Sequence, residues 1–198
     1  MATPSDLPVL PFASQHEWEQ WLEANHAHSA GVWLKIAKKN AGVPTVTYAE
    51  AVESALCYGW IDSHKKSFDA RYFLQKFSPR GPKSIWSKIN CEKTEQLMTT
   101  DRMKPAGVRT VESAKADGRW DAAYASQSKA DIPADFQTAL DANSQAKAFF
   151  ATLNRVNRYA IYFRIQNAKK PETRAKNIAK FIEMLAQGKT IYPQKPVR

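Results

Sequence analysis

The stretch Cys57–Asn90, CYGWIDSHKKSFDARYFLQKFSPRGPKSIWSKIN, decides the fold of this chain. Within it, WIDSHKK and ARYFLQKF are two short strand candidates, and the Ser67–Asp69 region between them is a turn candidate. Pro79, Gly81 and Pro82 then end the pattern, because proline lacks an N–H and glycine permits sharp turns. The stretch therefore predicts a β-hairpin followed by a break.

A third strand and two helices are predicted before the hairpin. Residues 32–38, VWLKIAK, alternate apolar and exposed positions as a half-buried strand does. Capping boxes at Ser14 and Thr47 predict the start of two helices. In a capping box, a hydroxyl and a later glutamate accept hydrogen bonds from the first free N–H groups. The first 13 residues contain three prolines and are expected to form an extended arm. These elements predict an α+β fold, a small antiparallel sheet covered by helices.

The chain after the hairpin is expected to be helical. Ser84 is predicted to cap a helix that contains Trp86 and Ile89, with Asn90 as a second cap further along. Pro105 then opens a helix that runs to Gly118.

A second domain is predicted at the C-terminal end. The small and polar residues 123–131 are the best linker candidate. One long helix is expected over residues 144–168 and another from Pro171 to Gly188. Two domains are expected. Residues 1–122 are predicted to form an α+β domain that holds the WID and PRGPKSIWS motifs. Residues 123–198 are predicted to form a basic, all-helical C-terminal module.

Charge is distributed unevenly along the chain. The net charge is +10, yet residues 1–60 carry −3, residues 61–120 carry +6 and residues 121–198 carry +7. Such asymmetry favours an anionic partner, which could be a nucleic acid, a phosphorylated ligand or an acidic membrane surface. The alternative is a solvated surface that serves solubility.

Several classes of site are not indicated. Two cysteines do not form a disulfide framework, and no apolar run approaches the ~18 residues of a membrane helix. The N-terminus lacks the charged and apolar regions of a signal peptide, so a cytoplasmic protein with free thiols is expected. No metal site and no cofactor are expected, because ligand spacing is missing among His16, His26, His28, His64, Cys57 and Cys91.

Five blocks of sequence carry a family resemblance. In chain order they are ALCYGWIDSHKK, FSPRGPKSIWSKIN, MKPAG, GRWDAAY and AKKPETRAKNIAKFIEMLAQGK. Together they resemble the YdeI/OmpD-associated family, whose members are often called bacteriocin-protection proteins. The resemblance runs from about Trp18 to Tyr192.

The resemblance implies a small bacterial protein with an α+β front part and a helical C-terminal module. It also implies a stress-response role in tolerance of bacteriocins or cationic antimicrobial peptides. Some relatives are named for association with an outer-membrane porin, and others join a frataxin-like front domain to the same tail. The resemblance carries over no catalytic residues.

The clearest candidate ligand site is an anion site in Ser78–Ser87. A helix that begins at Ser84 would present free N–H groups and the positive end of its dipole. With the guanidinium of Arg80 these groups suit a phosphate or carboxylate. The alternative is a capped helix start with two solvated cations. The candidate ligand-binding residues are Arg80, Lys83, Ser84, Trp86 and Ser87.

Asp62 is the second candidate, because it lies between apolar residues in a strand. A carboxylate there needs a partner, which could be Arg80, His64 or Ser84. Asp62, His64 and Asn90 are therefore predicted to orient the anion site. A purely structural bond that ties the hairpin to the turn is the favoured reading of Asp62, because no second carboxylate or nucleophile accompanies it.

Aromatic residues alternate with cations around the hairpin, a pattern that single-stranded nucleic-acid binders use. Strand alternation also places aromatics in the core and cations outside, and this reading is favoured. The aromatics are Trp60, Tyr72, Phe77 and Trp86, and the cations are Lys65, Lys66, Arg71, Lys76 and Lys88.

The C-terminal tail is a third basic region. Two helices that meet at Pro171 could gather its cations on one surface, where phosphates or an anionic membrane could bind. A solvated face is the equal alternative. The candidate surface residues are Arg155, Arg158, Arg174, Lys176 and Lys180.

Binding rather than catalysis is expected, because no complete catalytic motif is present. The predicted ligand is a small anion, held between the 60–77 hairpin and the helix from Ser84, or a protein partner. One alternative is a nucleic-acid-binding protein that uses the basic tail. The other is an enzyme on a small anionic substrate, with Asp62 or His64 as acid or base.

Overall fold

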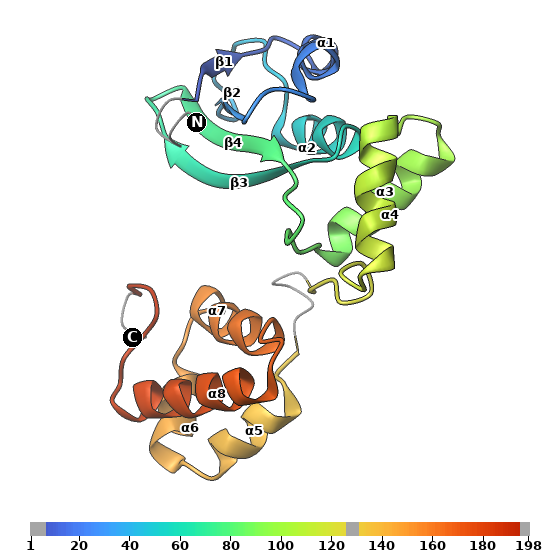
Figure 1. Cartoon of the computed structure of the whole chain (residues 1–198). Helices are drawn as coiled ribbons and strands as arrows, with labels where there is room; N and C mark the ends of the chain where they lie inside the picture. Colours follow the sequence, from blue (N-terminus) through green and yellow to red (C-terminus); the bar gives the residue numbers. More distant parts are fainter. Residues whose placement is uncertain (1–6, 126–130, 195–198) are drawn as a thin grey trace. The chain divides into compact units, whose positions relative to one another are not determined.

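The computed structural model describes residues 7–125 and 131–194. The chain divides into two compact units, Met1–Ala123 and Tyr124–Arg198 (Figure 1). Each unit has its own buried apolar core. The described residues combine a four-stranded sheet with helices, which confirms the predicted α+β class. Of the predicted linker 123–131, residues 126–130 lie outside the described residues.

The sheet of the first unit is mixed. Its strands β1 (Val9–Pro11), β2 (Val32–Ala37), β3 (Trp60–Ser67) and β4 (Tyr72–Pro79) lie in the order β1-β2-β4-β3. The pairs β2–β4 and β3–β4 are antiparallel, whereas β1 is parallel to β2. This edge corrects the expected antiparallel sheet. Of the extended arm expected over the first 13 residues, Val9–Pro11 form β1, and residues 1–6 lie outside the described residues. Pro11 is compatible with a strand because an edge strand pairs on one side only.

The predicted hairpin is confirmed as β3 and β4. Its turn is held by the carboxylate of Asp69, whose Oδ1 accepts hydrogen bonds at 2.8 Å from the backbone N–H of both Arg71 and Tyr72. Aspartate often closes a turn in this way, because its short side chain reaches the backbone two residues on. A bulge between Asp62 and Lys65 shifts the register of β3.

Helices α1 (Gln15–Asn25) and α2 (Tyr48–Cys57) begin at the predicted caps. Ser14 accepts a hydrogen bond from the N–H of Glu17, and Thr47 forms a complete capping box. Both helices contribute buried apolar residues to the first core, to which β2 also contributes. The indole N–H of Trp18 donates to the carbonyl of Ala51 at 3.1 Å, so the polar end of the largest core residue is satisfied.

Helix α3 (Lys88–Thr99) begins later than predicted. Its cap is Ser87, whose side chain accepts from the N–H of Asn90, so the expected helix start at Ser84 is wrong. Ser84 instead closes a turn with Gly81, because its N–H donates to the Gly81 carbonyl and its Oγ accepts from the Gly81 N–H, both at 3.0 Å. Trp86 is 1% exposed, so the segment between turn and helix serves to bury an indole.

Helix α4 (Pro105–Ala116) begins at Pro105 as predicted. It packs tightly on the end of α2 through two glycines. A Cβ at Gly107 would lie 2.2 Å from the carbonyl oxygen of Cys57, and one at Gly59 would lie 2.7 Å from Thr110. Gly59 also has φ +73°, a conformation that favours glycine.

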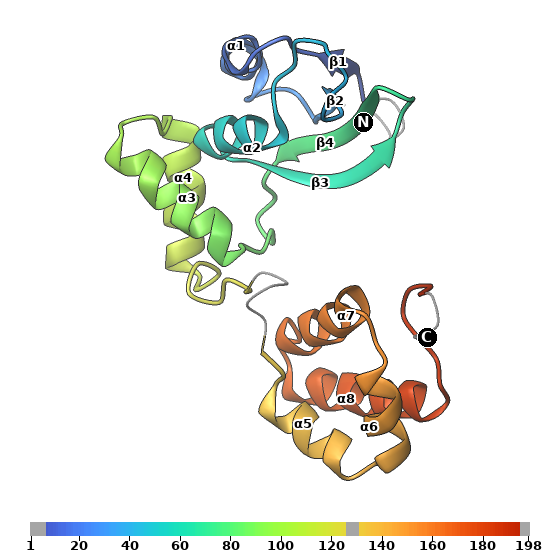
Figure 2. The same cartoon turned by 180° about the vertical axis from the view of Figure 1, so that it is seen from behind.

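The second unit is helical, as predicted. Helix α8 contacts each of the other three helices around a shared apolar core (Figure 2). No helix in the described parts of the chain is long and apolar enough to cross a membrane. The helices are α5 (Ala134–Asp141), α6 (Ser144–Ala151), α7 (Arg155–Gln166) and α8 (Pro171–Ala186).

The single long helix expected over residues 144–168 is instead two helices, α6 and α7. Asn154 caps α7 by accepting from the N–H of Asn157, and Leu153 between the helices is buried. Asn157 is fully buried, and its amide bonds to the carbonyl of Tyr192 at 3.1 Å. The break therefore lets the chain turn while both helices keep an apolar face on the core.

Candidate anion-binding cavity

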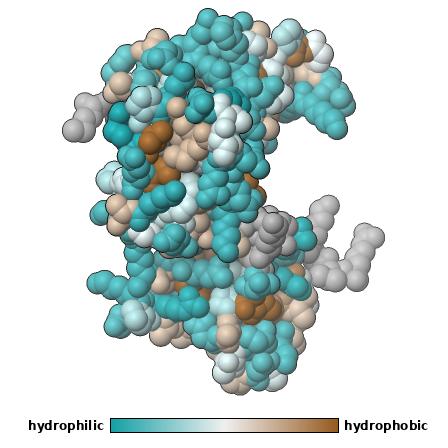
Figure 3. All heavy atoms as spheres, turned by 90° about the vertical axis from the view of Figure 1, so that its right-hand side faces the viewer, coloured by the Kyte–Doolittle hydropathy of each residue, from teal (hydrophilic) through white to brown (hydrophobic). Residues whose placement is uncertain are grey.

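A cavity of about 390 Å³ lies in the first unit where the ends of β3 and β4 meet α4. Three arginines from three different segments line it. Seen from the side drawn in Figure 3, the surface is mostly hydrophilic, with hydrophobic residues in small groups. The cavity is lined by His26, Ala27, Tyr58, Gly59, Trp60, Pro79, Arg80, Gly81, Pro82, Ala106, Arg109, Thr110, Ser113 and Arg119.

Arg80 is positioned by the end of β4 and by Trp86. Its backbone N–H donates to the carbonyl of Gly59 at 3.0 Å. Its guanidinium carbon lies 3.6 Å from the centre of the Trp86 ring, and Nη1 donates to the Ile85 carbonyl at 3.3 Å. Stacking on a buried indole holds the planar guanidinium in one orientation, so its charge stays at the cavity.

Arg119 is almost buried, with 9% of its side chain exposed. Its Nε pairs with the carboxylate of Asp117 at 2.8 Å. Its Nη1 donates to the carbonyl of Ser84 at 3.0 Å, and its Nη2 donates to Ser113 Oγ at 3.1 Å. These bonds fix the guanidinium, and Asp117 offsets part of its charge.

Arg109 differs from the other two arginines. It is exposed on α4, and it forms no hydrogen bond or ion pair with any residue that the structure describes. The hydroxyl of Thr110 beside it donates to the Gly107 carbonyl at 2.8 Å. A guanidinium with free donors on the wall of a cavity is available to a carboxylate or a phosphate.

His26 and Tyr58 also line the cavity. Nδ1 of His26 lies 2.9 Å from the Leu22 carbonyl, and because a carbonyl can only accept, this nitrogen carries a proton. The Tyr58 hydroxyl donates to Glu23 at 2.8 Å. Burial, followed by that bond to Glu23, raises the pKa of Tyr58, so the phenol stays neutral.

The structure places the predicted site residues apart. Arg80 lines the cavity, but Lys83 is exposed outside it and Ser84 contributes a backbone carbonyl to Arg119. The groove expected between the hairpin and a helix at Ser84 is therefore corrected to a cavity beside α4. Ser87 caps α3, and Trp86 lies beneath Arg80.

The predicted orienting residues are also elsewhere. Asp62 accepts a hydrogen bond from the Tyr48 hydroxyl at 2.8 Å, so the expected partner Arg80, His64 or Ser84 is corrected. His64 is exposed in the bulge of β3, and Asn90 lies in the first turn of α3. None of these three is among the described residues that line the Arg80 cavity.

Sequence reasoning missed His26, Arg109, Ser113 and Arg119. The arginine of GRW was visible as part of a block, but Arg80 and His26, which line the same cavity, lie far from it in sequence. A helical spacing does link Arg109 and Ser113, since residues four apart share a helix face.

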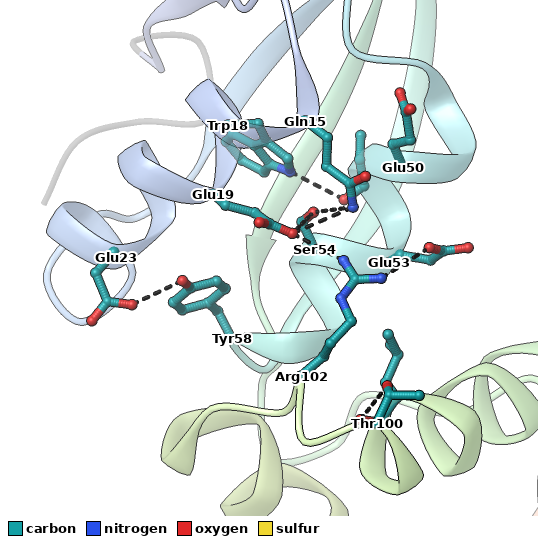
Figure 4. A network of polar contacts seen from close by, with 12 residues as sticks. Gln15, Trp18, Glu19, Glu23, Glu50, Glu53, Ser54, Tyr58, Thr100 and Arg102 are labelled. Atoms are coloured by element: carbon teal, nitrogen blue, oxygen red, sulfur yellow. Dashed lines mark hydrogen bonds and ion pairs between the residues drawn. The ribbon is translucent and has the colours of Figure 1, made fainter.

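A second polar cluster, not found from the sequence, joins α1, α2 and α3 (Figure 4). Oε1 of Glu19 accepts from the buried Ser54 hydroxyl at 2.8 Å and from Arg102 at 3.0 Å. Glu53 pairs with Lys93 at 3.1 Å and with Arg102 at 3.5 Å. Two carboxylates face two cations, so the cluster is balanced and links helices without excess charge.

The two cysteines are free and buried. Burial raises the pKa of both Cys57 and Cys91 to about 11. The thiols are therefore protonated at neutral pH and are poor nucleophiles. Among the described residues, no group of three His, Cys, Asp or Glu side chains could hold a metal ion.

The predicted basic surface of the tail is partly committed to the fold. Arg174 pairs with Asp135 at 2.6 Å, and Arg158 donates to the Ala151 carbonyl at 2.7 Å. Arg155, Lys176 and Lys180 are exposed. A groove of about 980 Å³ between α5 and α8 is lined mainly by alanine and isoleucine.

Family comparisons match the front and back of the chain separately. Residues 10–110 match the model of a family described as Domain of unknown function (DUF8412), which covers half of the chain. The chain belongs to this family. In this DUF8412 chain the matched region holds His26, Arg80 and Arg109, whereas Arg119 lies beyond it.

Residues 129–188 match the model of the OmdA family, described as Bacteriocin-protection, YdeI or OmpD-Associated. The predicted resemblance is thereby confirmed for the C-terminal part of this DUF8412 chain. Its expected extent, from about Trp18 to Tyr192, is corrected to those residues. No curated protein and no solved structure matches the chain.

Proposed function

We propose that this chain is a non-enzymatic binding protein of the bacteriocin-protection type that holds a small anionic ligand in the Arg80–Arg109–Arg119 cavity. The observation that carries the proposal is the convergence of three guanidiniums on one cavity. Asp117 offsets one of them, but no Asp or Glu is among the described residues that line the cavity. A concave site with excess positive charge attracts and retains anions.

The size and rigidity of the cavity fit a small ligand. A volume of about 390 Å³ is at the small end of the range of ligand sites. Arg80 and Arg119 are held by their contacts before any ligand binds, so binding costs little ordering of these side chains. Guanidinium groups match carboxylate and phosphate oxygens in pairs, which makes a polycarboxylate or phosphate compound the expected ligand class.

The remaining alternatives are less well supported. An enzyme that uses Asp62 or His64 as acid or base would need that residue beside the bound anion, and neither lines the cavity. Nucleic-acid binding by the tail would rest on exposed Arg155, Lys176 and Lys180, because Arg158 and Arg174 are engaged within the second unit. The protective role itself is supported by the description of the family that matches residues 129–188.

Arg109→Gln is the test of the cavity. Titration calorimetry of the full chain with phosphate, pyrophosphate and citrate at low salt should detect binding of at least one anion. The variant should weaken that binding about tenfold or more, since a hydrogen bond to a charged group contributes about 1.5–3 kcal/mol. The Tm of the variant should not change, because Arg109 makes no bond within the described structure.

Lys83→Gln is the matched control, because Lys83 is an exposed cation near the cavity that does not line it. This variant should change the affinity for the anion by no more than about twofold, because solvent and salt screen a surface charge. The proposed anion site would be refuted if none of the three anions binds, or if both variants weaken anion binding equally. Survival of a bacteriocin-treated host that expresses each variant then tests whether protection needs the cavity.

A further inference from the structure

The face of the sheet turned away from the core has the features of a second binding surface. Val32, Leu34 and Ile36 of β2 are buried in the first core. Side chains alternate along a strand, so Trp33 and Lys35 lie on the opposite face. We call this opposite face, with its neighbours on β3, β4 and the hairpin turn, the outer sheet face.

Strand register identifies those neighbours. On β4, Lys76 lies opposite Trp33, Leu74 opposite Lys35, and Tyr72 opposite Ala37. On β3, Lys66 lies opposite Leu74. Three adjacent strands therefore bring aromatic rings and lysines together on one flat surface.

Lysine side chains cover the rings of the outer sheet face. Lys66 Nζ lies 4.1 Å from the centre of the Trp33 ring, and Lys35 Nζ lies 4.2 Å from Tyr72 and 4.6 Å from Phe68. Leu74 at the centre is only 3% exposed, although it points away from the core. Rings and lysine stems thus form a small apolar platform with charged groups above it.

Positive charge dominates this face, and the acidic residue of the hairpin turn, Asp69, has its Oδ1 engaged by the backbone N–H groups of Arg71 and Tyr72. Lys35, Lys66 and Lys76 come from three strands, and Arg71 follows at the hairpin turn. Asp62, the acidic residue of β3, is paired opposite Phe77, whose ring is buried in the core. Within the described strands, no Asp or Glu lies on the outer sheet face.

We propose that the outer sheet face binds a single-stranded polynucleotide, with bases stacked on Trp33 and Tyr72 and phosphates paired with Lys35, Lys66 and Lys76. A lysine over an exposed ring contributes only about 0.5–1 kcal/mol. A base stacked on an aromatic ring contributes about 1–3 kcal/mol. Exchange of the lysine for a base is therefore favourable, and the displaced ammonium group is then free to pair with the adjacent phosphate.

A duplex fits this face less well than a single strand. The bases of a duplex are stacked on each other, so their faces are not available to Trp33 or Tyr72. A polyanion without bases would engage the lysines but not the rings. The arrangement therefore predicts preference for single strands, and RNA or DNA can supply the same chemistry.

The test uses the full chain with labelled single-stranded DNA, single-stranded RNA and duplex DNA, each of about 12 nucleotides, a length that one small binding face covers. Fluorescence anisotropy should show binding of a single strand, with the duplex bound at least about tenfold more weakly. Trp33→Thr should weaken single-strand binding about tenfold, the effect of one lost stacking position. Threonine is chosen because it preserves strand propensity.

The salt dependence of binding, and binding to heparin, distinguish the contribution of the aromatic rings from that of the lysine charges. Lys66→Gln should lower the slope of log K against log salt by about 0.7, the value for one phosphate contact on a single strand. It should also weaken binding to heparin, whereas Trp33→Thr should not. Thermal unfolding of each variant checks that the sheet is intact.

The controls assign the result to one surface. Lys176→Gln with Lys180→Gln tests the tail, and Arg109→Gln tests the cavity; neither should change single-strand binding. The proposal is overturned by absent binding, by equal binding of duplex, by an unchanged affinity in Trp33→Thr, or by dependence on the tail lysines. Failure of the cavity proposal would leave these measurements unaffected.

Discussion

At the scale of single residues, Arg80 shows why a correctly chosen side chain can have unexpected partners. The sequence predicted that Arg80 binds an anion beside Ser84 and pairs with Asp62. In the fold, Arg80 stacks on Trp86, and Asp62 accepts its hydrogen bond from Tyr48. The buried indole of Trp86 determines the orientation of the Arg80 guanidinium, because the stacking contact and the hydrogen bond to the Ile85 carbonyl hold the group in one orientation.

Gly107 is the residue for which the structure predicts the sharpest loss of stability. A Cβ there would lie 2.2 Å from the carbonyl oxygen of Cys57, which cannot yield because it is backbone. Gly107→Ala should lower the free energy of unfolding by about 1–3 kcal/mol, the cost of overpacking. This loss should exceed the helix propensity that alanine adds. Urea denaturation followed by tryptophan fluorescence measures it.

Gly81→Ala is the control for that substitution. A Cβ at Gly81 would find its nearest neighbour, Ser84 Oγ, at 3.8 Å. The free energy of unfolding should therefore change by no more than about 0.5 kcal/mol, as for ordinary surface substitutions. Equal stability of the two variants would show that α4 does not pack on Cys57 as described.

At the scale of elements, hydroxyl and amide caps decide where helices begin. The boxes at Ser14 and Thr47 were recognised because cap and glutamate have a fixed spacing. Ser84 was expected to begin a helix, but the observed cap of α3 is Ser87, three residues later, because Trp86 enters the core in between. Asn154 is likewise a cap inside what looked like continuous helix.

The pair Asp135–Arg174 links α5 to α8 and predicts a pH-dependent stability. The hydrogen bond from Arg174 holds the pKa of Asp135 below its ordinary value of 3.8. The pair therefore stabilises the fold above about pH 3.8, and this stabilisation is lost as the pH falls through the lowered pKa of the folded state. Asp135→Asn should cost less than about 1 kcal/mol at neutral pH, since both groups are partly exposed.

Circular dichroism during urea denaturation measures the difference between wild type and Asp135→Asn at neutral and acidic pH. The difference should shrink on acidification. Asp131→Asn serves as the control, because Asp131 is exposed and forms no ion pair with a described residue. A difference that stays constant with pH, or equals that of the control, would argue against the pair.

At the scale of the whole molecule, the change in net charge near residue 60 falls inside the first unit and not at the boundary between the two units. The two compact units each have a core, and the positive charge lies mainly after residue 60. Within the first unit, three of these cations, Arg80, Arg109 and Arg119, line the cavity, and others lie on the outer sheet face. The crowded basic and aromatic stretch from Cys57 to Asn90 therefore contributes to two surfaces.

The two units should unfold in separate steps. All six tryptophans lie in the first unit, between Trp18 and Trp120. Tryptophan fluorescence therefore reports on that unit, whereas far-ultraviolet circular dichroism reports on both. We expect the two urea curves not to coincide, which is the sign of more than two states.

Gly107→Ala distinguishes independent units from a single cooperative one. It should shift the fluorescence transition and leave the part of the circular dichroism signal that comes from the second unit in place. Coincident curves in both the wild type and this variant would mean that the chain unfolds as one unit.

The α+β class, the hairpin, the helical tail and the caps at Ser14 and Thr47 could all be predicted from the sequence. These features depend on neighbours within a few residues, such as alternation, cap spacing and proline positions. The resemblance of the tail was also readable, because its block is continuous in sequence and matches the OmdA model over residues 129–188.

The parallel edge strand, the late start of α3 and the composition of the cavity could not be predicted from local sequence. Each depends on contacts between distant segments: Trp33 with Pro8, Trp86 with the core, and Arg80 with Arg109 and Arg119 around one space. Local patterns state which side chains are charged or apolar. Long-range packing determines which of these side chains meet. Here the predicted site was a helix end, whereas the structure has a cavity lined by three arginines.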